Sequence, residues 1–274
     1  MKNLIQRTIS GIIFIAIVIG SILWNQYSFG VAFAIITALS LYEFHKLTNH
    51  QEHVEVNTVC SIIGGLLIFT CSYLYATSIF PFQIYLVYGL YLVFTFIAEL
   101  YRKKEQPLHN WSYLLLGQIF IAIPFSLLNF ILFTPVYQPL MLIALFVTIW
   151  VNDTGAYIVG VTSSKFGNHR LFERISPKKS WEGFIGGAIF ALLSGYIFSL
   201  FITELSLLQW LIFSEIIVIF GTFGDLIESL MKRTLHVKDS GNIIPGHGGI
   251  LDRFDSMLLA APMIFIYLTI LSLF

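Results

Sequence analysis

Charged side chains are scarce in this chain of 274 residues, which has 15 Lys and Arg and 15 Asp and Glu. Only 11% of its residues are charged, whereas soluble domains carry about 25%. The formal net charge is zero, which argues against the basic surface of a nucleic-acid-binding protein. A chain with so little charge cannot cover a water-facing surface, so we expect lipid to be its main solvent.

Cysteine is also scarce, and the two present, Cys60 and Cys71, lie in one apolar segment. They have no metal-ligand spacing, so we interpret them as reduced packing residues. The chain shows no clear internal repeat, no low-complexity tract and no soluble domain. The first apolar run, Ile9 to Trp24, lacks a convincing cleavage site, and further apolar runs follow it, which argues against a cleavable signal peptide.

Long apolar runs dominate, since 57% of the residues are hydrophobic and 26 are Phe. A helix needs about 20 apolar residues to cross a bilayer. Candidate spans cover residues 8–24, 28–45, 58–78, 82–100, 111–133, 138–161, 183–203, 208–227 and 255–274. The first two are short and close together, so they could form a tight hairpin or a partly re-entrant pair. The predicted fold is an all-α, polytopic membrane bundle with about nine transmembrane helices.

All 15 Lys and Arg fall on one side of the membrane when the spans alternate in direction. They lie near the amino terminus and in the segments 46–57, 101–110, 162–182 and 228–254. By the positive-inside rule this side is cytoplasmic. We expect a single membrane domain over residues 1–274, with an apolar scaffold at 1–135 and a catalytic half at 136–274 that carries the loops 162–182 and 228–254.

Polar residues gather where the eighth span ends. Asp225 and Ser229 lie four residues apart and Asp225 and Glu228 three, so the three side chains share one helix face. An ionisable residue at membrane depth indicates function. The alternative is a helix-end acid neutralised by Lys232 or Arg233.

A glycine-rich segment with Lys238, Asp239 and His247 leads from there to the ninth span. Its glycines supply backbone freedom and amides that can cradle an anion. Asp252 and Asp255 follow at three-residue spacing, where the ninth span begins. Carboxylates of this kind suit Mg²⁺, which takes one or two of them together with substrate phosphates. The alternative is a connector whose charges only face water.

The loop 162–182 has a third polar cluster. Ser176 followed by Pro177 predicts a helix start, with Ser at the cap and Pro at the first position. Lys178 and Lys179 in the first turn would then oppose the helix dipole unless an anion binds there. This mismatch favours phosphate binding, while topology and lipid headgroups could also explain the two lysines.

Other polar residues inside the spans are fewer. Asn152 and Asp153 lie in the sixth span, where such side chains usually face the bundle interior. We expect Glu43 and Glu99 to end helices and to pair with nearby basic residues. Glu215 has no assigned role.

Three strings in this half, in chain order, resemble the phosphatidate cytidylyltransferases, or CDP-diacylglycerol synthases. The longest begins at Ser229 with S-L-M-K-R, continues after four residues with K-D-S-G, and ends at Asp255 with P-G-H-G-G-I-L-D-R-F-D. The strings 152–157 and 176–183 also look like that family. The resemblance is close over the carboxyl-terminal half and extends to the first half only as apolar spans.

The resemblance implies transfer of CMP from CTP to phosphatidate, giving CDP-diacylglycerol and pyrophosphate, with Mg²⁺ and with a second cation left open. The lipid phosphate attacks, so the protein needs positioning and electrostatics rather than a covalent nucleophile. The expected catalytic residues are Asp225, Asp252, Ser229 and His247, with Asp225, Asp252 and Asp255 as metal ligands. The expected phosphate ligands are Lys178, Lys179, Lys232, Arg233, Lys238 and Arg253, supported by Asp153, Glu228, Asp239, Gly248 and Gly249.

The expected partners are CTP and phosphatidate in the bilayer, without nucleic acid and with a homodimer left open. We expect an integral protein of the bacterial cytoplasmic membrane, with its site on the cytoplasmic side, acting in phospholipid biosynthesis. Another membrane transferase acting on a lipid phosphate would use the same carboxylates and cations. A transporter is the second alternative, but transporters tend to show internal repeats, and here the polar residues gather in one half.

Overall fold

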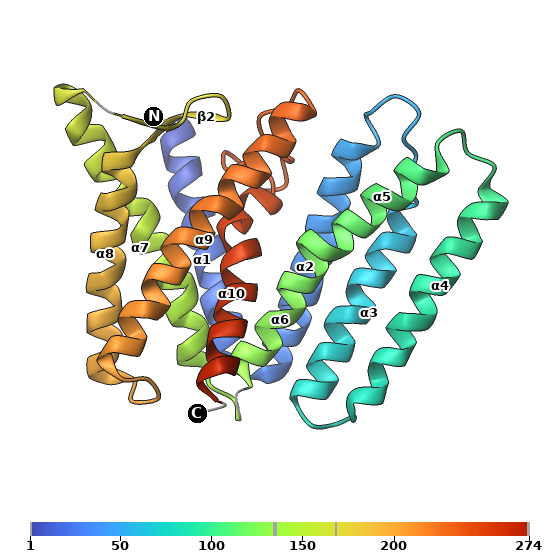
Figure 1. Cartoon of the computed structure of the whole chain (residues 1–274), viewed down its shortest axis with the longest axis horizontal. Helices are drawn as coiled ribbons and strands as arrows, with labels where there is room; N and C mark the ends of the chain where they lie inside the picture. The colour runs from blue at the N-terminus through green and yellow to red at the C-terminus, as the bar shows by residue number, and fades with distance from the viewer. Residues whose placement is uncertain (1, 134–135, 168, 273–274) are drawn as a thin grey trace. The chain divides into compact units, whose positions relative to one another are not determined.

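A computed structural model describes residues 2–133, 136–167 and 169–272, and these fold almost wholly into helices (Figure 1). The long helices are α1 (Lys2–Trp24), α2 (Gln26–Thr48), α3 (Thr58–Ala76), α4 (Tyr85–Arg102), α5 (Pro107–Gly117), α6 (Ile123–Leu132), α7 (Pro139–Ser163), α8 (Trp181–Phe201), α9 (Leu207–Thr234) and α10 (Asp255–Leu271). A π-helical turn, η2 (Gln118–Ala122), joins α5 to α6, and short 3-10 turns form η1 (Phe82–Ile84), η3 (Ser164–Phe166) and η4 (Leu251–Arg253). Two short strands, β1 (Arg170–Phe172) and β2 (Ser176–Ser180), pair antiparallel.

Eight helical segments among the described residues are long and apolar enough to cross a membrane. They are Gln6–Trp24, Gln26–Thr48, Thr58–Ala76, Phe82–Arg102, Pro107–Leu132, Pro139–Ser163, Trp181–Phe201 and Leu207–Thr234. Helix α10 is a shorter apolar helix of 17 residues and coincides with the ninth expected span. The predicted all-α membrane fold is therefore confirmed.

Contacts between residues divide the chain into two compact units. The first unit comprises Met1–Pro139 and Thr234–Phe254, and the second comprises Leu140–Arg233 and Asp255–Phe274. The glycine-rich segment after α9 thus packs with the amino-terminal helices. The prediction of one membrane domain stays a prediction.

In the first unit, α1 and α2 form a tight hairpin in which Asn25 is the only residue between the helices. The Asn25 side chain accepts hydrogen bonds from the backbone amides of Tyr27 and Ser28, both at 2.9 Å. Ser28 Oγ in turn accepts from the Asn25 amide, which completes a capping box. The expected tight turn is therefore confirmed, and each helix is long and apolar enough to cross a membrane by itself.

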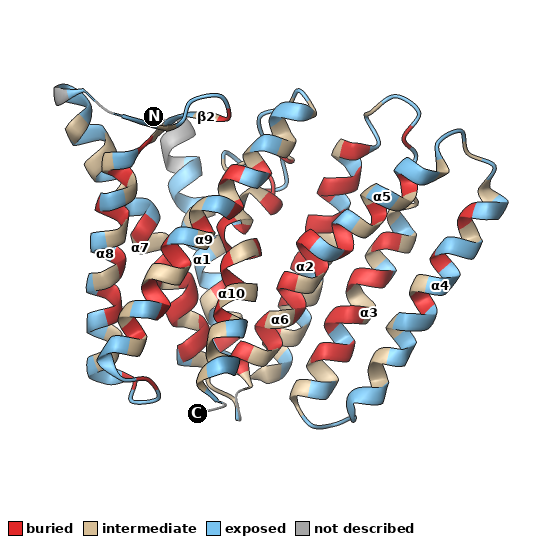
Figure 2. Ribbon diagram, viewed as in Figure 1, coloured by how far each residue is buried: buried red, intermediate tan, exposed pale blue. Residues whose placement is uncertain are grey.

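The core of the first unit gathers around Phe254, the last residue of its carboxyl-terminal segment. The Phe254 ring meets Phe14, Phe33 and Phe125 edge-on, with centroids 5.5, 6.3 and 5.2 Å away. Figure 2 shows long buried stretches on α2 and α6, whereas α4 is mostly exposed. These aromatic contacts hold the end of the glycine-rich segment against α1, α2 and α6.

The second unit packs through small residues on α8. Gly183, Gly187, Ala191 and Gly195 recur every four residues, and all four are buried. A side chain at Gly187 would collide with Asn152 of α7, and one at Gly195 would collide with Trp210 of α9. Small residues allow such close approach where lipid removes the hydrophobic drive for helix association.

One expected helix start is wrong. Ser176 and Pro177 lie in strand β2, and α8 begins at Trp181 with Ser180 as its cap. Ser180 Oγ accepts from the Gly183 amide at 3.1 Å. With this start the acidic residue of the first helical turn is Glu182, which suits the helix dipole.

Candidate functional site

A polar cavity of about 620 Å³ lies in the second unit. Helices α7, α8 and α9, strand β2 and the start of α10 contribute to its lining. Its charged residues are Asp153, Asp225, Arg170, Lys178 and Lys179, and Asn152 adds a side-chain amide. Acids from α7 and α9 therefore meet two lysines from the β2 strand.

Asp225 has the best-defined contacts in this cavity. Lys179 Nζ lies 2.6 Å from its Oδ2, and Ser229 Oγ donates to its Oδ1 at 3.1 Å. The predicted face shared by Asp225 and Ser229 is confirmed. The cation in contact with Asp225 is Lys179, from a segment 46 residues earlier in the chain, while Lys232 forms an i,i+4 ion pair with Glu228.

Asp255 opens α10 beside the same acid. It accepts the Ser256 amide at 2.6 Å and interacts with Asp225 and Asp153, whose like charges repel it. Gly224 makes this approach feasible, because an added Cβ there would lie 2.5 Å from the Asp255 carbonyl oxygen. Three carboxylates therefore share one electrostatic environment, which a cation would stabilise.

The β1–β2 hairpin holds Lys178 and Lys179 at the cavity. The backbone amide of Trp181 donates to the His169 carbonyl at 2.9 Å, and the Glu182 carboxylate accepts from the His169 ring at 2.7 Å. These contacts fix the strand that precedes α8, so that Lys179 is partly buried and Lys178 is exposed at the cavity wall. The predicted loop 162–182 therefore has local structure that sequence reasoning missed.

Asp252 has different partners in the first unit. Its Oδ2 accepts the backbone amides of Ser240 and Gly249, at 2.9 and 2.8 Å. Between these two positions the chain makes a tight turn, in which the Ile244 amide donates to the Gly248 carbonyl at 3.0 Å. The carboxylate thus ties both arms of the glycine-rich segment together.

Glycine is required at two points of that turn. Gly246 and Gly248 have φ angles of +78° and +82°, a region that L residues rarely adopt. An added Cβ at Gly248 would also lie 2.7 Å from the Asp252 carboxylate. Gly249 is buried against Ser240 and Glu43, so it serves close packing. The supporting roles expected for Gly248 and Gly249 are therefore conformational and steric.

Glu43 of α2 is a site residue that sequence reasoning missed. It is 1% exposed, and its Oε2 accepts from Ser240 Oγ at 3.1 Å and from the Leu251 amide at 2.9 Å. The expected pairing with nearby basic residues is wrong for Glu43. It is right for Glu99, which lies 2.7 Å from Arg102. The sequence signal that could have identified Glu43 was a single acid near the end of an apolar span.

A second polar cavity, of about 430 Å³, lies at the turn of the first unit. Its charged lining consists of Arg7, Lys238, Asp239 and Arg253. His247 joins them, with its Nδ1 2.9 Å from Ser10 Oγ of α1. Burial and the neighbouring Arg253 and Arg7 charges lower the pKa of His247, so the neutral ring is favoured near pH 7.

The structure therefore groups the predicted residues in two sets. The second unit holds Asp153, Lys178, Lys179, Asp225, Glu228, Ser229, Lys232, Arg233 and Asp255, and the first holds Lys238, Asp239, His247, Gly248, Gly249, Asp252 and Arg253. Helix α9 extends through Thr234, so Glu228, Lys232 and Arg233 are helical rather than part of a loop. No three His, Cys, Asp or Glu side chains of the described residues converge at metal-binding distance. A metal ion shared by Asp225 and Asp252 stays a prediction.

Known proteins are similar to this chain over nearly its whole length. The profile of the cytidylyltransferase family matches residues 5–271. A phosphatidate cytidylyltransferase of Bacillus subtilis is 30% identical over 99% of this chain and all of its own length. One from Haemophilus influenzae is 32% identical, covering 94% of this chain and 96% of its own. One from Staphylococcus haemolyticus is 49% identical over 45% of this chain and 46% of its own. The chain is thus an integral membrane protein that belongs to the cytidylyltransferase family.

Proposed function

We propose that this protein is a phosphatidate cytidylyltransferase that makes CDP-diacylglycerol and pyrophosphate from CTP and phosphatidate for phospholipid biosynthesis. The observation that carries the proposal is the full-length similarity to proteins of that name. The cavity of the second unit supplies chemistry that fits, with carboxylates and lysines at one end of a helical bundle.

The reaction needs two polyanions held close together. A phosphate oxygen of phosphatidate forms a bond to the α-phosphorus of CTP, while the bond from that phosphorus to the oxygen bridging the β-phosphate breaks and pyrophosphate leaves. Lys178 and Lys179 would offset the charge of the nucleotide phosphates. Because the lipid itself is the nucleophile, catalysis depends on positioning and electrostatics.

The residues of the second unit fit a magnesium ion. Asp225 and Asp153 place hard carboxylate oxygens at the cavity, with Asp255 beside them. Mg²⁺ takes few protein carboxylates and completes its shell with substrate phosphates and water, which agrees with the sparse donor set here. When bound, the ion would neutralise developing charge on phosphate oxygens. We propose Asp225 as its main ligand, and Asp252 as a second ligand remains the sequence prediction.

Lys179 then holds the Asp225 carboxylate while no other cation competes for it. Its ammonium lies 2.6 Å from Asp225 Oδ2, and a lysine side chain can rotate from the acid to a phosphate because it acts as a point charge. Ser229 orients the other oxygen of the same carboxylate through its 3.1 Å hydrogen bond. These contacts support a positioning role for Ser229 and a substrate-binding role for Lys179.

The proposed location is the bacterial cytoplasmic membrane, with the site facing the cytoplasm. Support comes from the placement of all 15 Lys and Arg on one predicted face and from the bacterial relatives. A homodimer and the absence of a nucleic-acid partner stay predictions.

The test is transfer of labelled CMP from CTP to phosphatidate by the purified protein in lipid. We expect CDP-diacylglycerol with Mg²⁺ and its loss on chelation. Parallel reactions with UTP, and with a polyprenyl phosphate in place of phosphatidate, distinguish the alternative transferases. No CDP-lipid under any divalent metal would reject the proposal.

A further inference from the structure

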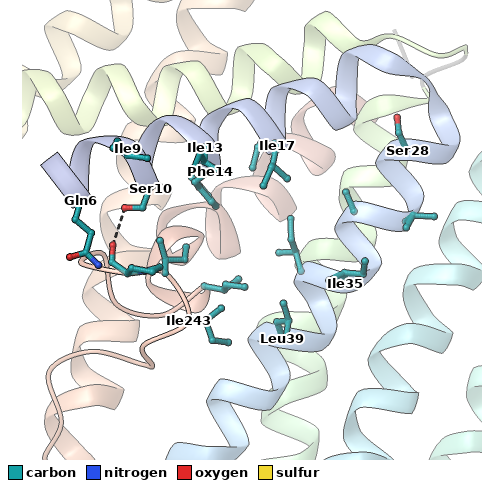
Figure 3. Close-up of a pocket in the computed structure, with 17 residues that line it drawn as sticks. Gln6, Ile9, Ser10, Ile13, Phe14, Ile17, Ser28, Ile35, Leu39 and Ile243 are labelled. Carbon is teal, nitrogen blue, oxygen red and sulfur yellow. Dashed lines mark hydrogen bonds between the residues drawn. The ribbon is translucent and has the colours of Figure 1, made fainter.

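A large apolar cavity of about 1090 Å³ lies in the first unit between α1 and α2 (Figure 3). Ile9, Ile13 and Ile17 of α1 face Ile35 and Leu39 of α2 across it. The two helices meet near Ser28, where their hairpin turns, and separate toward the segment that carries Ile243. The cavity is therefore a wedge with a closed apolar end and a wider end at the glycine-rich segment.

The lining of this wedge is open to its surroundings. Ile13, Ile17 and Ile35 are 52, 55 and 54% exposed in the first unit. Apolar walls with this exposure are compatible with entry from the hydrocarbon region of a bilayer. Because lipid tails are as apolar as Leu, the walls admit a chain without discriminating between lipids. Selection must come from the wider end.

That end adjoins the basic cavity described above. Ile244 and Pro245 line both cavities, so the two cavities adjoin at these residues. Ser10 of α1 lines the apolar wedge and donates to the Pro245 carbonyl at 2.9 Å, which fixes the boundary to α1 (Figure 3).

The basic cavity has an excess of positive charge. Arg7, Lys238 and Arg253 contribute three cations against the single acid Asp239. The Arg7 Nε donates to the Gly246 carbonyl at 2.8 Å, and an Arg253 terminal nitrogen donates to the His247 carbonyl at 2.8 Å. Each bond uses one of the five N–H donors of a guanidinium, and the remaining donors suit phosphate oxygens.

We propose that the apolar wedge holds an acyl chain of phosphatidate and that Arg7, Lys238 and Arg253 bind its phosphate monoester. The site matches the amphiphilic character of that lipid, with an apolar cavity that adjoins a cationic one. Arg7 then becomes a lipid ligand from α1, outside the signature-like segment. The naming of the lipid rests on the proposed function, whereas the site itself rests on the two cavities.

The direct test is photolabelling of the full-length protein in phosphatidylcholine nanodiscs without CTP. The probe is phosphatidate with a diazirine near the end of one acyl chain, and the labelled residues are mapped by mass spectrometry. We expect label on the lining residues at 13–18 and 28–36, where the two helices approach their turn. Label confined to other segments, as would follow if a second copy of the chain covered this face, overturns the proposal.

A matched pair of variants tests the wedge itself. Ile13 lines the cavity, while its neighbour Ile12 does not and is similarly exposed, at 61%. Ile13→Trp should lower labelling and raise the KM for phosphatidate about tenfold, with the KM for CTP unchanged, while Ile12→Trp should change neither. Equal effects of the two substitutions contradict the assignment.

The phosphate end is tested by headgroup preference, which a merely structural role would not alter. Wild-type protein should prefer the phosphatidate probe to a phosphatidylcholine probe with the same tail. Arg7→Gln should reduce that ratio about tenfold, as expected when one charge-assisted contact is lost, and Arg7→Lys should restore most of it. An unchanged ratio in Arg7→Gln removes Arg7 from the site.

These results separate this inference from the proposed function. If the wild-type protein makes CDP-diacylglycerol but the probe labels other segments, the lipid site is wrong and the function stands. If it makes no CDP-lipid but the probe labels the wedge with the expected headgroup preference, the lipid-phosphate site is supported and the cytidylyltransferase function fails.

Discussion

Asp225 of the second unit and Asp252 of the first lie 27 residues apart, yet their carboxylates have different neighbours. Asp225 faces a polar cavity with Lys179 and is influenced by a second acid, Asp255. Asp252 accepts two backbone amides and is linked through Ser240 to the buried Glu43. In the first arrangement a metal ion can take the place of Lys179 at Asp225 while the lysine moves to a phosphate, whereas the second arrangement stabilises a turn.

Two acids of the same sequence motif can therefore have different roles. The Asp225 contacts are ionic and partly solvated, so substrates can compete for them. Asp252 Oδ2 instead accepts two backbone amides that hold the arms of a turn together. Substitutions at both positions should therefore reduce turnover. Only the substitution at Asp252 should change the hydrogen exchange of the glycine-rich segment.

The largest effect is expected from Asp225→Asn. The amide keeps the shape and removes the charge that would hold Mg²⁺, so kcat should fall about a thousandfold. CDP-diacylglycerol formation from labelled CTP measures the loss, and the thermal midpoint should change little. The exposed loop acid Glu204 supplies the matched control Glu204→Gln, which should keep normal turnover. Near-normal turnover in Asp225→Asn removes this residue from the metal proposal.

Asp252→Ala should lower the local stability of the turn in the first unit. It leaves the amides of Ser240 and Gly249 without their acceptor, at about 1–3 kcal/mol for each unsatisfied group. Hydrogen exchange of these two amides should accelerate about tenfold or more, since 1.4 kcal/mol corresponds to a factor of ten. Exchange in the second unit should not change. Unaltered protection at Ser240 and Gly249 would show that the turn does not depend on Asp252.

A smaller effect is expected from Glu43→Ala, which removes the acceptor of Ser240 Oγ and the Leu251 amide. The glycine-rich segment should lose about 1–3 kcal/mol of local stability and exchange faster. Glu99→Ala is the matched control, because Glu99 is a buried acid of the same unit that pairs with Arg102 and Asn110 instead. If both variants loosen the segment equally, the effect comes from burial in general and not from Glu43.

The smallest effect concerns pH and His247. Its pKa is lowered by burial and by Arg253 and Arg7, so the folded segment binds this proton less readily than the unfolded one. The resulting stability is present above about pH 6.5, the unfolded pKa, and is lost as pH falls through the lowered folded pKa. NMR of ring-labelled histidine in the intact protein, with His247→Gln to assign the signal, measures it. A pKa at or above the ordinary value contradicts the described contacts.

Much of the fold was predictable because each span is a local apolar run. Asn25 also carries its own cap, so the α1–α2 hairpin depends on residues close together in sequence. Ser176 and Pro177 gave a wrong prediction because a helix-cap signal depends only on neighbouring residues. The pairing of β2 with β1 (Arg170–Phe172) overrides that signal. Local rules predict an element well only where no partner strand or helix competes.

The types of residue in the site were predictable from the sequence, but the pairs of residues that contact each other were not. Asp225 and Ser229 share a helix, so their 3.1 Å contact follows from spacing. The Glu43 contact with Ser240 joins residues 197 apart in sequence, and the Lys179 contact with Asp225 joins two separate segments. Such contacts arise from packing of whole helices, which a motif does not encode.

The most direct test of the assignment of Asp225 is Mn²⁺ binding, followed by electron paramagnetic resonance with CTP present. Wild-type protein should bind Mn²⁺, and Asp225→Asn should bind it about 10–100-fold more weakly, while hydrogen exchange of the Ser240 and Gly249 amides stays at the wild-type rate. Equal Mn²⁺ affinity in the two proteins would contradict the assignment of Asp225 as the metal-binding acid of the second unit.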